Sequence, residues 1–340
     1  MTPEVLTAIT ERRNVANNAT KHLHRPRVVI FGSKGLAGSA ISRKFNDIGY
    51  DVYEITHDMC DASKFHQVCN VFSRLHKTPD VVVNCIAYSV VDLKSNEEAN
   101  KSYFANVIAP YNIGTACIQF KAPLLIHIST DYVFNSHDGL KIQEDCQRYS
   151  PANLYGQYKL AGDMALVGLY DNWNFRNEDD PLKLRIVRTS SLYGPDRYTF
   201  VDYVVDEYLK EGTIKALTTG SSVPTSTRYL ADYIINLADD VLKADEDILN
   251  PVRYFKNCVC FNDIGNISRF RFAAYIVSFL REMNVPGNLT IEQARDCDFT
   301  ALRPLYSQLA PSASGNKPPD WYEELKDFLQ NKLDKMGLLK

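Results

Sequence analysis

The sequence of 340 residues lacks a long apolar run, a strong charge of one sign and a closely spaced pair of metal-ligand cysteines. No stretch is long and apolar enough to predict a membrane span, and the N-terminus lacks the hydrophobic region of a signal peptide. A net charge of -3 gives no electrostatic reason to expect nucleic acid or an anionic membrane surface as a partner. We therefore expect a cytoplasmic protein.

The eight cysteines are scattered, and none belongs to a C-x-x-C motif. Cys258 and Cys260 flank one residue in the strand-like stretch NCVCF, so strand alternation places both thiols on one sheet face. That placement suits core filling better than metal binding. The sequence predicts free structural thiols and no metal site.

Beyond residue 24, apolar strand-like runs alternate with stretches of helical period. RVVIFGSKGLAGSAISRKFNDIGYDVYEI gives a strand, a glycine turn, a helix and a second strand. VVVNCIA and LLIHI are near-continuous apolar runs, as buried parallel strands are. Right-handed crossovers between such strands predict an α/β fold, a Rossmann-type doubly wound parallel sheet with a smaller C-terminal substrate-binding lobe.

The same pattern predicts how the chain is divided. Residues 1–24 are polar and mixed in charge, and we expect a flexible N-terminal extension. Residues 25–190 are expected to form the Rossmann domain that binds NADP, with 226–250 returning to it. Residues 191–225 and 251–340 are expected to form the smaller substrate-binding lobe.

Gly32, Gly35 and Gly38 directly follow the first expected strand and open a helix. A backbone that turns tightly and approaches a pyrophosphate closely cannot carry Cβ atoms there, and the amides of a helix N-terminus face the anion. The alternative is a turn whose glycines serve packing alone. The loop predicts a dinucleotide site formed by Gly32, Ser33, Lys34, Gly35, Leu36, Ala37 and Gly38.

The end of the second expected strand bears on the choice of cofactor. An acidic residue there would bind the adenosine 2′-hydroxyl and repel a 2′-phosphate. YDVYEIT ends instead in Thr56, which His57 follows. The ammonium of Lys34 could meet a phosphate, with a solvated turn lysine as the alternative. NADP(H) is favoured, while nearby acidic residues leave NAD(H) open. Asp61 is a candidate adenine contact, with an N-cap for the next helix as the alternative.

Tyr155 and Lys159, in PANLYGQYKLAGD, are four residues apart and share one face of an expected helix. That helix follows the strand LLIHIST, so it starts near the carboxyl end of a parallel strand, where ligands bind in open α/β sheets. An ammonium favours the phenolate of a nearby tyrosine, and such a pair can protonate a carbonyl oxygen while a nicotinamide delivers hydride. Ser129 and Thr130 supply hydroxyls for that oxygen.

A second Tyr-x-x-x-Lys, formed by Tyr322 and Lys326, lies in the charged amphipathic stretch WYEELK. No glycine loop or strand-end hydroxyl is near it in sequence. We interpret this copy as a packing and solubility feature.

The motifs VVNCIAYSVVD, HISTDYVF, LYGQYKLAGD, RIVRTSSLYG, SVPT and LRPLYSQL occur in the order seen in dTDP-4-dehydrorhamnose reductases. The chain resembles that family from about residue 27 to about residue 310. The resemblance implies NADPH-dependent reduction of the C4 ketone of a nucleotide-linked 4-keto-6-deoxyhexose, with dTDP or UDP as the nucleotide. It implies that Thr130 is the catalytic hydroxyl, that Tyr155 is the acid, and that Lys159 binds the ribose and tunes Tyr155.

The resemblance also implies contacts beyond the catalytic group. Asp131, Tyr132 and Arg303 would lie at the sugar, although Arg303 has holding the C-terminal lobe as its alternative. Ala87 and Tyr88 would border the nicotinamide ribose. Asn106 would steady the sheet near the cofactor, with an ordinary helix-buried amide as the alternative.

Two departures from the family pattern affect the substrate side. Bacterial members usually have a tryptophan where this chain has Ser191, and TGSSVPT at 219–225 replaces a D-Q-x-G segment. The same motifs also resemble the regulatory β subunit of methionine adenosyltransferase, which binds NADP(H) and serves a catalytic subunit; the N-terminal extension and the departures favour that alternative. An epimerase or another keto-sugar reductase is a third. We rank the reductase first and expect a homodimer.

Overall fold

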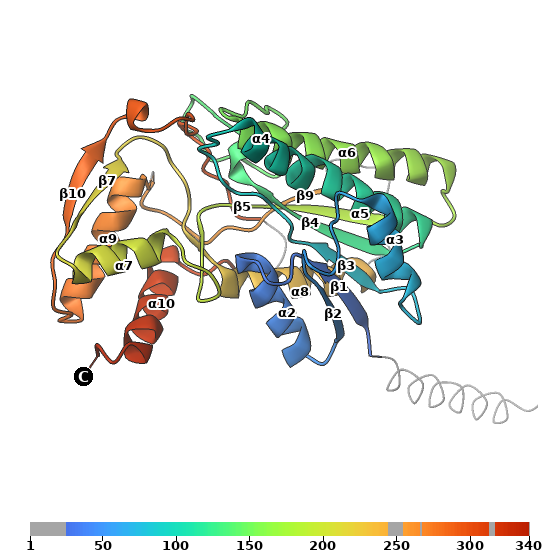
Figure 1. Ribbon diagram of the computed structural model, residues 1–340, viewed down its shortest axis with the longest axis horizontal. Coiled ribbons are helices and arrows are strands. Elements are labelled where there is room, and N and C mark those ends of the chain that lie inside the picture. Colours follow the sequence, from blue (N-terminus) through green and yellow to red (C-terminus); the bar gives the residue numbers. More distant parts are fainter. Residues whose placement is uncertain (1–24, 244–253, 266, 313–316, 340) are drawn as a thin grey trace, which may run out of the picture.

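The computed structural model describes residues 25–243, 254–265, 267–312 and 317–339 (Figure 1). The expected N-terminal extension, residues 1–24, lies outside the described residues, as do residues 244–250 of the segment expected to return to the Rossmann domain. In the described part of the chain, no helix has the length and apolarity needed to cross a membrane.

A six-stranded sheet forms the centre of the larger part, and its strands pair in parallel. The strand order is β2-β1-β3-β4-β5-β9, so the direction of chain progression reverses between β1 and β3. Such a reversal leaves a crevice at the carboxyl ends of the strands, where ligands bind. The strand bounds are β1 Arg27–Phe31, β2 Asp51–Ile55, β3 Val81–Asn84, β4 Leu124–Thr130, β5 Lys183–Thr189 and β9 Phe255–Asn257.

Helices cover both faces of this sheet (Figure 1). Successive side chains of β1 point to opposite faces of the sheet and so enter two different cores. Val28 and Ile30 belong to the core between the sheet and helices α2 and α8. Val29 and Phe31 belong to the core between the sheet and helices α3, α5 and α6. The doubly wound architecture predicted from the sequence is confirmed. The helix bounds are α2 Leu36–Asp47, α3 Phe65–Ser73, α4 Asn96–Tyr103, α5 Ala109–Gln119, α6 Leu154–Arg176 and α8 Thr227–Lys243.

A smaller lobe lies beside one end of the sheet (Figure 1). Trp321 is fully buried in it and packs edge-on against Phe272 and Tyr275. Two short parallel strand pairs, β7 with β10 and β6 with β8, belong to this region. Its elements are β6 Leu192–Tyr193, α7 Phe200–Leu209, β7 Thr213–Leu217, β8 Thr225–Ser226, α9 Arg269–Glu282, β10 Thr290–Ala294 and α10 Trp321–Lys335.

The structure differs from the predicted division of the chain at β9. Residues 255–257 were expected in the smaller lobe, but they pair with β5 at the edge of the main sheet. The strand FKN has three residues and one central cation, so it carries no apolar run that a sequence pattern detects. Cys258 and Cys260 follow it as free thiols buried in the hydrophobic core, which confirms the predicted core filling.

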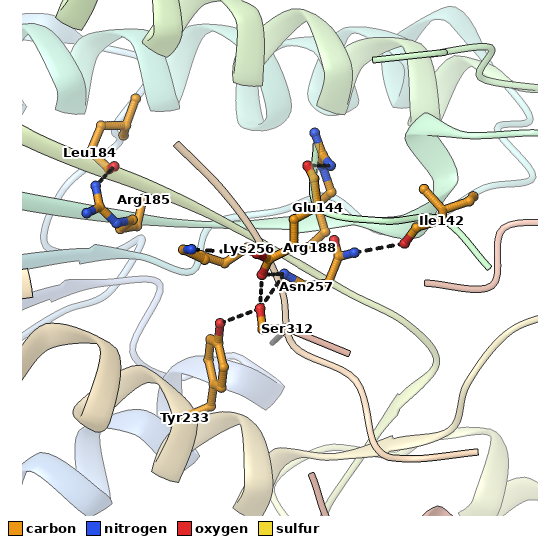
Figure 2. Close-up of polar contacts among 9 residues, drawn as sticks. All are labelled: Ile142, Glu144, Leu184, Arg185, Arg188, Tyr233, Lys256, Asn257 and Ser312. Carbon is orange, nitrogen blue, oxygen red and sulfur yellow. Dashed lines mark hydrogen bonds and ion pairs between the residues drawn. The ribbon is translucent and has the colours of Figure 1, made fainter. Parts of the chain in front are cut away.

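Glu144 joins the edge strand to the rest of the molecule (Figure 2). Its carboxylate accepts hydrogen bonds from the Asn257 N–H at 3.2 Å and from the Ser312 hydroxyl, and it lies 3.6 Å from Lys256 Nζ. Tyr233 of α8 bonds to Ser312 in turn, at 2.9 Å. One carboxylate thus ties the loop after β4, the edge strand and the chain beyond residue 309 together.

Arg188 of β5 lies beside this junction and is fully buried (Figure 2). Its guanidinium is 3.9 Å from the ring centre of Phe255, 4.9 Å from that of Phe134 and 5.5 Å from that of Tyr149. It donates to the Tyr149 hydroxyl at 2.8 Å. The ring faces offset part of the cost of burying this charge, which makes Arg188 a structural part of the RTS motif.

Candidate active site

The glycine loop joins β1 to α2 and turns at Gly32, whose φ is +74°. A Cβ on Gly32 would lie 3.0 Å from the Cys85 carbonyl carbon, and a Cβ on Gly38 would lie 2.2 Å from the Gly32 oxygen. The first turn of α2 has no side-chain cap and no acidic residue, so its amides are open to an anion. The buried Ser33 hydroxyl has no partner among the described residues.

A cavity of about 560 Å³, a size typical of cofactor sites, lies beside this loop. It is bordered by the carboxyl ends of β1, β2 and β3 and by residues 101–105. Of the predicted cofactor residues, those that line it are Gly32, Lys34, Gly35, His57, Asp61, Ala87 and Tyr88. The other four predicted loop residues lie in the turn and the first turn of α2 and do not line the cavity: Ser33, Leu36, Ala37 and Gly38.

Basic side chains outnumber acidic ones around the cavity. Lys34, His57, Lys101 and Arg197 line it, against Asp61 as the single carboxylate of its lining. Arg197 comes from the segment after β6, and its Nε donates to the Lys34 carbonyl at 2.9 Å. The sequence analysis missed Arg197 because only the folded chain brings a residue that distant to the glycine loop.

Asp61 does not cap the following helix. Its carboxylate accepts hydrogen bonds from the Ser63 N–H at 3.0 Å and the Ser63 hydroxyl at 2.7 Å, whereas Lys64 occupies the N-cap position of α3. The N-cap alternative is therefore wrong, and Asp61 holds a local turn at the cavity wall.

Thr130 ends β4, and Tyr155 and Lys159 lie one turn apart near the start of α6. The helix starts there because the Asn153 side chain caps it, accepting the Gly156 N–H at 3.0 Å. All three predicted catalytic side chains are buried, and the Tyr155 ring packs edge-on against Tyr132. The fold therefore gathers them at the carboxyl edge of the sheet. None of the three belongs to the lining of the cavity.

Burial has the largest effect on the acid–base state of Tyr155. Burial raises the pKa of Tyr155 well above its usual value, and the hydrogen bond with the Thr130 hydroxyl opposes this shift without overcoming it. Tyr155 is thus a phenol at neutral pH, the form that donates a proton. Lys159 Nζ contacts other groups, and the tuning of Tyr155 by Lys159 stays a prediction.

Lys159 Nζ donates to the Ile128 carbonyl at 2.8 Å and lies 3.0 Å from His127 Nε2. Burial lowers the pKa of Lys159 to about 8, and the Asp163 carboxylate acts against that shift. The sequence analysis did not single out this group, which we call the buried polar cluster. Its members are Asn84, His127, Ser129, Lys159 and Asp163, each at most 4% exposed.

Asp131, predicted at the sugar, is turned into the protein. It is 2% exposed, and its carboxylate accepts hydrogen bonds from the Ser190 hydroxyl at 2.9 Å and the Ser307 hydroxyl at 2.7 Å. Burial raises the pKa of Asp131 to about 6. The residue joins the end of β4 to the LRPLYSQL segment instead of presenting its carboxylate to a ligand.

Arg303 and Asn106 are also occupied by protein partners. Arg303 forms a two-pronged ion pair with Asp92, in line with the alternative that it holds the C-terminal segment. Asn106 lies in a π-helical turn, η1 (Phe104–Ile108), between α4 and α5. Its amide accepts the Tyr88 N–H at 3.2 Å and donates to the Tyr88 carbonyl at 3.0 Å. Asn106 therefore positions Tyr88 and does not itself line the cavity.

The two departures from the family pattern, at Ser191 and at residues 219–225, are in contact in the structure. Ser191 has a φ of 43°, unusual for a residue with a side chain, and its hydroxyl donates to that of Ser222 at 2.8 Å. The neighbouring Ser190 hydroxyl accepts the Val223 N–H at 3.2 Å. A hydrogen-bonded hydroxyl pair joins the two changed segments, so we interpret the changes as one coupled alteration.

The second Tyr-x-x-x-Lys lies in α10 of the smaller lobe. The Tyr322 ring packs against Phe279 and Tyr275. This contact agrees with the packing interpretation of that copy.

A parallel sheet that opens with a glycine loop and gathers a hydroxyl, a tyrosine and a lysine at one edge is typical of the extended short-chain dehydrogenases/reductases, and the chain has the fold of that class. The family model described as the RmlD substrate binding domain matches residues 26–333, and the chain belongs to that family.

Similar proteins agree with this placement. A dTDP-4-dehydrorhamnose reductase of Mycolicibacterium smegmatis is 31% identical over 63% of this chain, a match that spans 60% of the reductase's own length. The spore coat polysaccharide biosynthesis protein SpsK of Bacillus subtilis is 26% identical over 90% of this chain and 98% of its own. The crystal structure of the Bacillus anthracis dTDP-4-dehydrorhamnose reductase in complex with NADP is 26% identical, with a TM-score of 0.73 over 91% of this chain and 100% of that one.

Proposed function

We propose that the protein reduces the C4 ketone of a nucleotide-linked 4-keto-6-deoxyhexose with NADPH, converting dTDP-4-dehydro-L-rhamnose to dTDP-L-rhamnose. One observation carries the proposal. In a chain of this family, Thr130, Tyr155 and Lys159 converge at the sheet edge next to a cavity of cofactor size. Cys85, which lines that cavity, also interacts electrostatically with Lys159, so the two regions adjoin.

The residues around the cavity fit a dinucleotide. The glycine loop leaves no room for Cβ atoms where a pyrophosphate would lie, and the α2 amides face the same point. Lys34 and Arg197 supply positive charge for an adenosine 2′-phosphate, and β2 is followed by Thr56 rather than an acid, which supports NADPH over NADH. The NADP complex of the B. anthracis relative supports the same choice. NADPH, when bound, supplies a hydride.

Reduction of a ketone adds a hydride to carbon and a proton to oxygen. In the proposed reaction, the Tyr155 O–H bond breaks and a new O–H bond forms on the substrate oxygen. The Thr130 hydroxyl donates a hydrogen bond to that oxygen and stabilises its developing negative charge. Burial supports this direction of transfer because it keeps Tyr155 protonated until the substrate oxygen becomes the stronger base.

The test is NADPH oxidation with dTDP-4-dehydro-L-rhamnose generated in situ. We expect turnover by the wild type and by Tyr158→Phe, a matched change on the same helix. Tyr155→Phe should lose at least about 100-fold in kcat while still binding NADPH. Full turnover in folded Tyr155→Phe would contradict its role as proton donor.

The regulatory alternative makes the opposite prediction. It rests on the coupled alteration at Ser191 and Ser222, which removes an aromatic wall expected in the sugar pocket. Tight NADPH binding without turnover of dTDP and UDP keto-sugars would favour it. The next experiment would then be binding to a methionine adenosyltransferase catalytic subunit. The homodimer stays a prediction, to be checked by sedimentation.

A further inference from the structure

The segment 194–197, which follows β6, is fixed to the larger part of the molecule at its start, its centre and its end. At its start, a Cβ on Gly194 would lie 2.0 Å from the Thr227 hydroxyl oxygen, so the backbone touches the first residue of α8. At its end, Arg197 Nε donates to the carbonyl of Lys34 in the glycine loop at 2.9 Å. The central contact is an ion pair made by Asp196.

That ion pair joins the segment to α2. Arg43 of α2 donates from Nη1 to Asp196 Oδ1 and from Nη2 to Asp196 Oδ2, both at 3.0 Å. The Asp196 side chain is 14% exposed and that of Arg43 is 54% exposed. A fork-to-fork pair of this kind fixes the relative orientation of its two side chains as well as their distance. It therefore sets how the segment lies along α2, the helix whose first-turn amides are open to an anion.

Arg197 keeps most of its donors for the cavity beside the glycine loop. Its Nε is used by the Lys34 carbonyl, and in the described part of the chain its two Nη groups have no hydrogen bond or ion pair. Lys34 and His57 line the same cavity. His57 follows the end of β2, where the adenosine ribose lies in folds of this kind. The planar fork of a guanidinium matches the oxygens of a phosphate.

Asp196 places a carboxylate directly before this guanidinium in the chain. An unpaired carboxylate there would repel a phosphate and would compete for the Arg197 fork. Arg43 occupies both carboxylate oxygens and offsets their charge, so neither effect operates. Arg43 and Asp196 are both absent from the lining of the cavity. What they supply to a ligand there is the placement of Arg197.

We propose that Arg43 and Asp196 are positioning residues whose ion pair holds the segment 194–197 on α2, so that the Arg197 fork faces an adenosine 2′-phosphate. The inference rests on the NADPH preference within the proposed function. It extends that preference from the side chain that binds the phosphate to the pair that orients this side chain.

The experiment is calorimetric titration of the full chain with adenosine 2′,5′-bisphosphate and with AMP, which differ only in the 2′-phosphate. We expect the wild type to bind the bisphosphate at least about 10-fold more tightly than AMP, and Arg197→Gln to lose most of that ratio. Arg43→Gln and Asp196→Asn should each weaken bisphosphate binding by about 3- to 5-fold and AMP binding by less than about 2-fold.

The sign of the Asp196→Asn effect separates positioning from simple charge. Removing a negative charge near a phosphate would on its own tighten binding, so tighter or unchanged binding of the bisphosphate overturns the proposal. Equal losses for the two nucleotides also overturn it, because they indicate general damage to the glycine loop. In the Arg197→Gln background, Asp196→Asn should cost no more than about 1.5-fold, since the pair acts through Arg197. Fully additive losses contradict that route.

Lys44→Gln is the matched control. Lys44 is the next residue of α2 and pairs with Asp232, so this variant also removes a partly exposed ion pair of the same helix. It should leave the ratio of the two affinities unchanged, and a loss equal to that of Arg43→Gln would assign the effect to the charge of α2 in general.

The two proposals fail separately. Neither nucleotide carries a nicotinamide or a ketone, so the titrations are readable in a protein that lacks reductase activity. Absence of turnover together with the expected ratios would contradict the proposed reaction and support the positioning role. A wild type that binds both nucleotides equally would overturn the positioning role even if the keto-sugar is reduced.

Discussion

Asp92 and Arg303 are 211 positions apart in the chain and form a two-pronged ion pair. The same carboxylate accepts the N–H groups of Thr300 and Ala301, both at 3.0 Å. The Arg303 guanidinium holds the pKa of Asp92 down to about 2. The loop after β3 and the segment that leads into LRPLYSQL are thereby joined at one point.

This pair predicts strong coupling between its members. Asp92→Asn and Arg303→Gln should each lower the free energy of unfolding by about 1–2 kcal/mol, because each leaves a partly buried charge without its partner. The double variant should lose little more than the worse single variant in urea unfolding. Strictly additive losses would show that Arg303 contributes mainly through contacts other than Asp92.

The buried carboxylate of Asp131 predicts a pH dependence of stability. Its folded pKa of about 6 lies above the unfolded value of about 3.9, so between these values the folded state binds more protons. Stability should therefore fall as pH rises from about 4 to about 6.5, by about 2–3 kcal/mol from this group. Asp131→Asn should lack that fall.

The measurement is the free energy of unfolding in urea at a series of pH values. Subtracting the curve of Asp131→Asn from that of the wild type isolates the contribution of this residue. Parallel curves would mean that the pKa of Asp131 is the same in the folded and unfolded states.

Arg197 predicts selectivity between the two nicotinamide cofactors. Arg197→Gln should weaken NADPH binding by about 10-fold and NADH binding by less than about 2-fold, because only NADPH carries the 2′-phosphate. Calorimetric titration at low and moderate salt measures both constants. Arg148→Gln, a change at an exposed arginine of another loop, is the control. Equal losses for both cofactors would assign Arg197 to loop structure alone.

Two glycines of α6 predict opposite effects of the same substitution. A Cβ on Gly162 would lie 2.1 Å from the Asn106 carbonyl oxygen, whereas a Cβ on Gly168 would meet nothing within 4 Å. Gly168→Ala should stabilise by about 0.5–1 kcal/mol through helix propensity. Gly162→Ala should destabilise by about 2 kcal/mol or more because backbone must move. Thermal unfolding of both variants is the measurement, and equal shifts would contradict the close approach.

The central sheet and the glycine loop could be predicted because their signals are local. The apolar runs of β1, β3 and β4 and the spacing of Gly32, Gly35 and Gly38 each lie within a few residues of one another. The convergence of Thr130, Tyr155 and Lys159 could be predicted because Thr130 ends one of these strands and Tyr155 lies near the start of the next helix. Such patterns place residues on elements, and parallel topology then places the elements.

The directions of individual side chains could not be predicted in the same way. Asp131 and Arg303 lie near the site as expected, but buried hydroxyls and Asp92 occupy their polar atoms. Those partners come from segments distant in sequence.

His127 is a different case, because its signals were present. His127 and Ser129 alternate onto one face of β4, and Lys159 and Asp163 are one turn apart on α6. The alternation of β4 and the four-residue spacing of α6, considered together, would have identified the buried polar cluster.

In the π-helical turn η1, the number of residues determines the position of Asn106 more than the identity of the exposed side chains does. Each residue of an α-helix advances the face by about 100°, so removing one residue from 104–108 would regularise the helix and rotate Asn106 away from Tyr88. Most single substitutions on the exposed side of this stretch leave that alignment unchanged. Homologues should therefore differ in amino-acid type at the exposed positions of this stretch and almost never in the number of its residues. A single-residue deletion here should impair cofactor binding, while the core packing of α5 is kept.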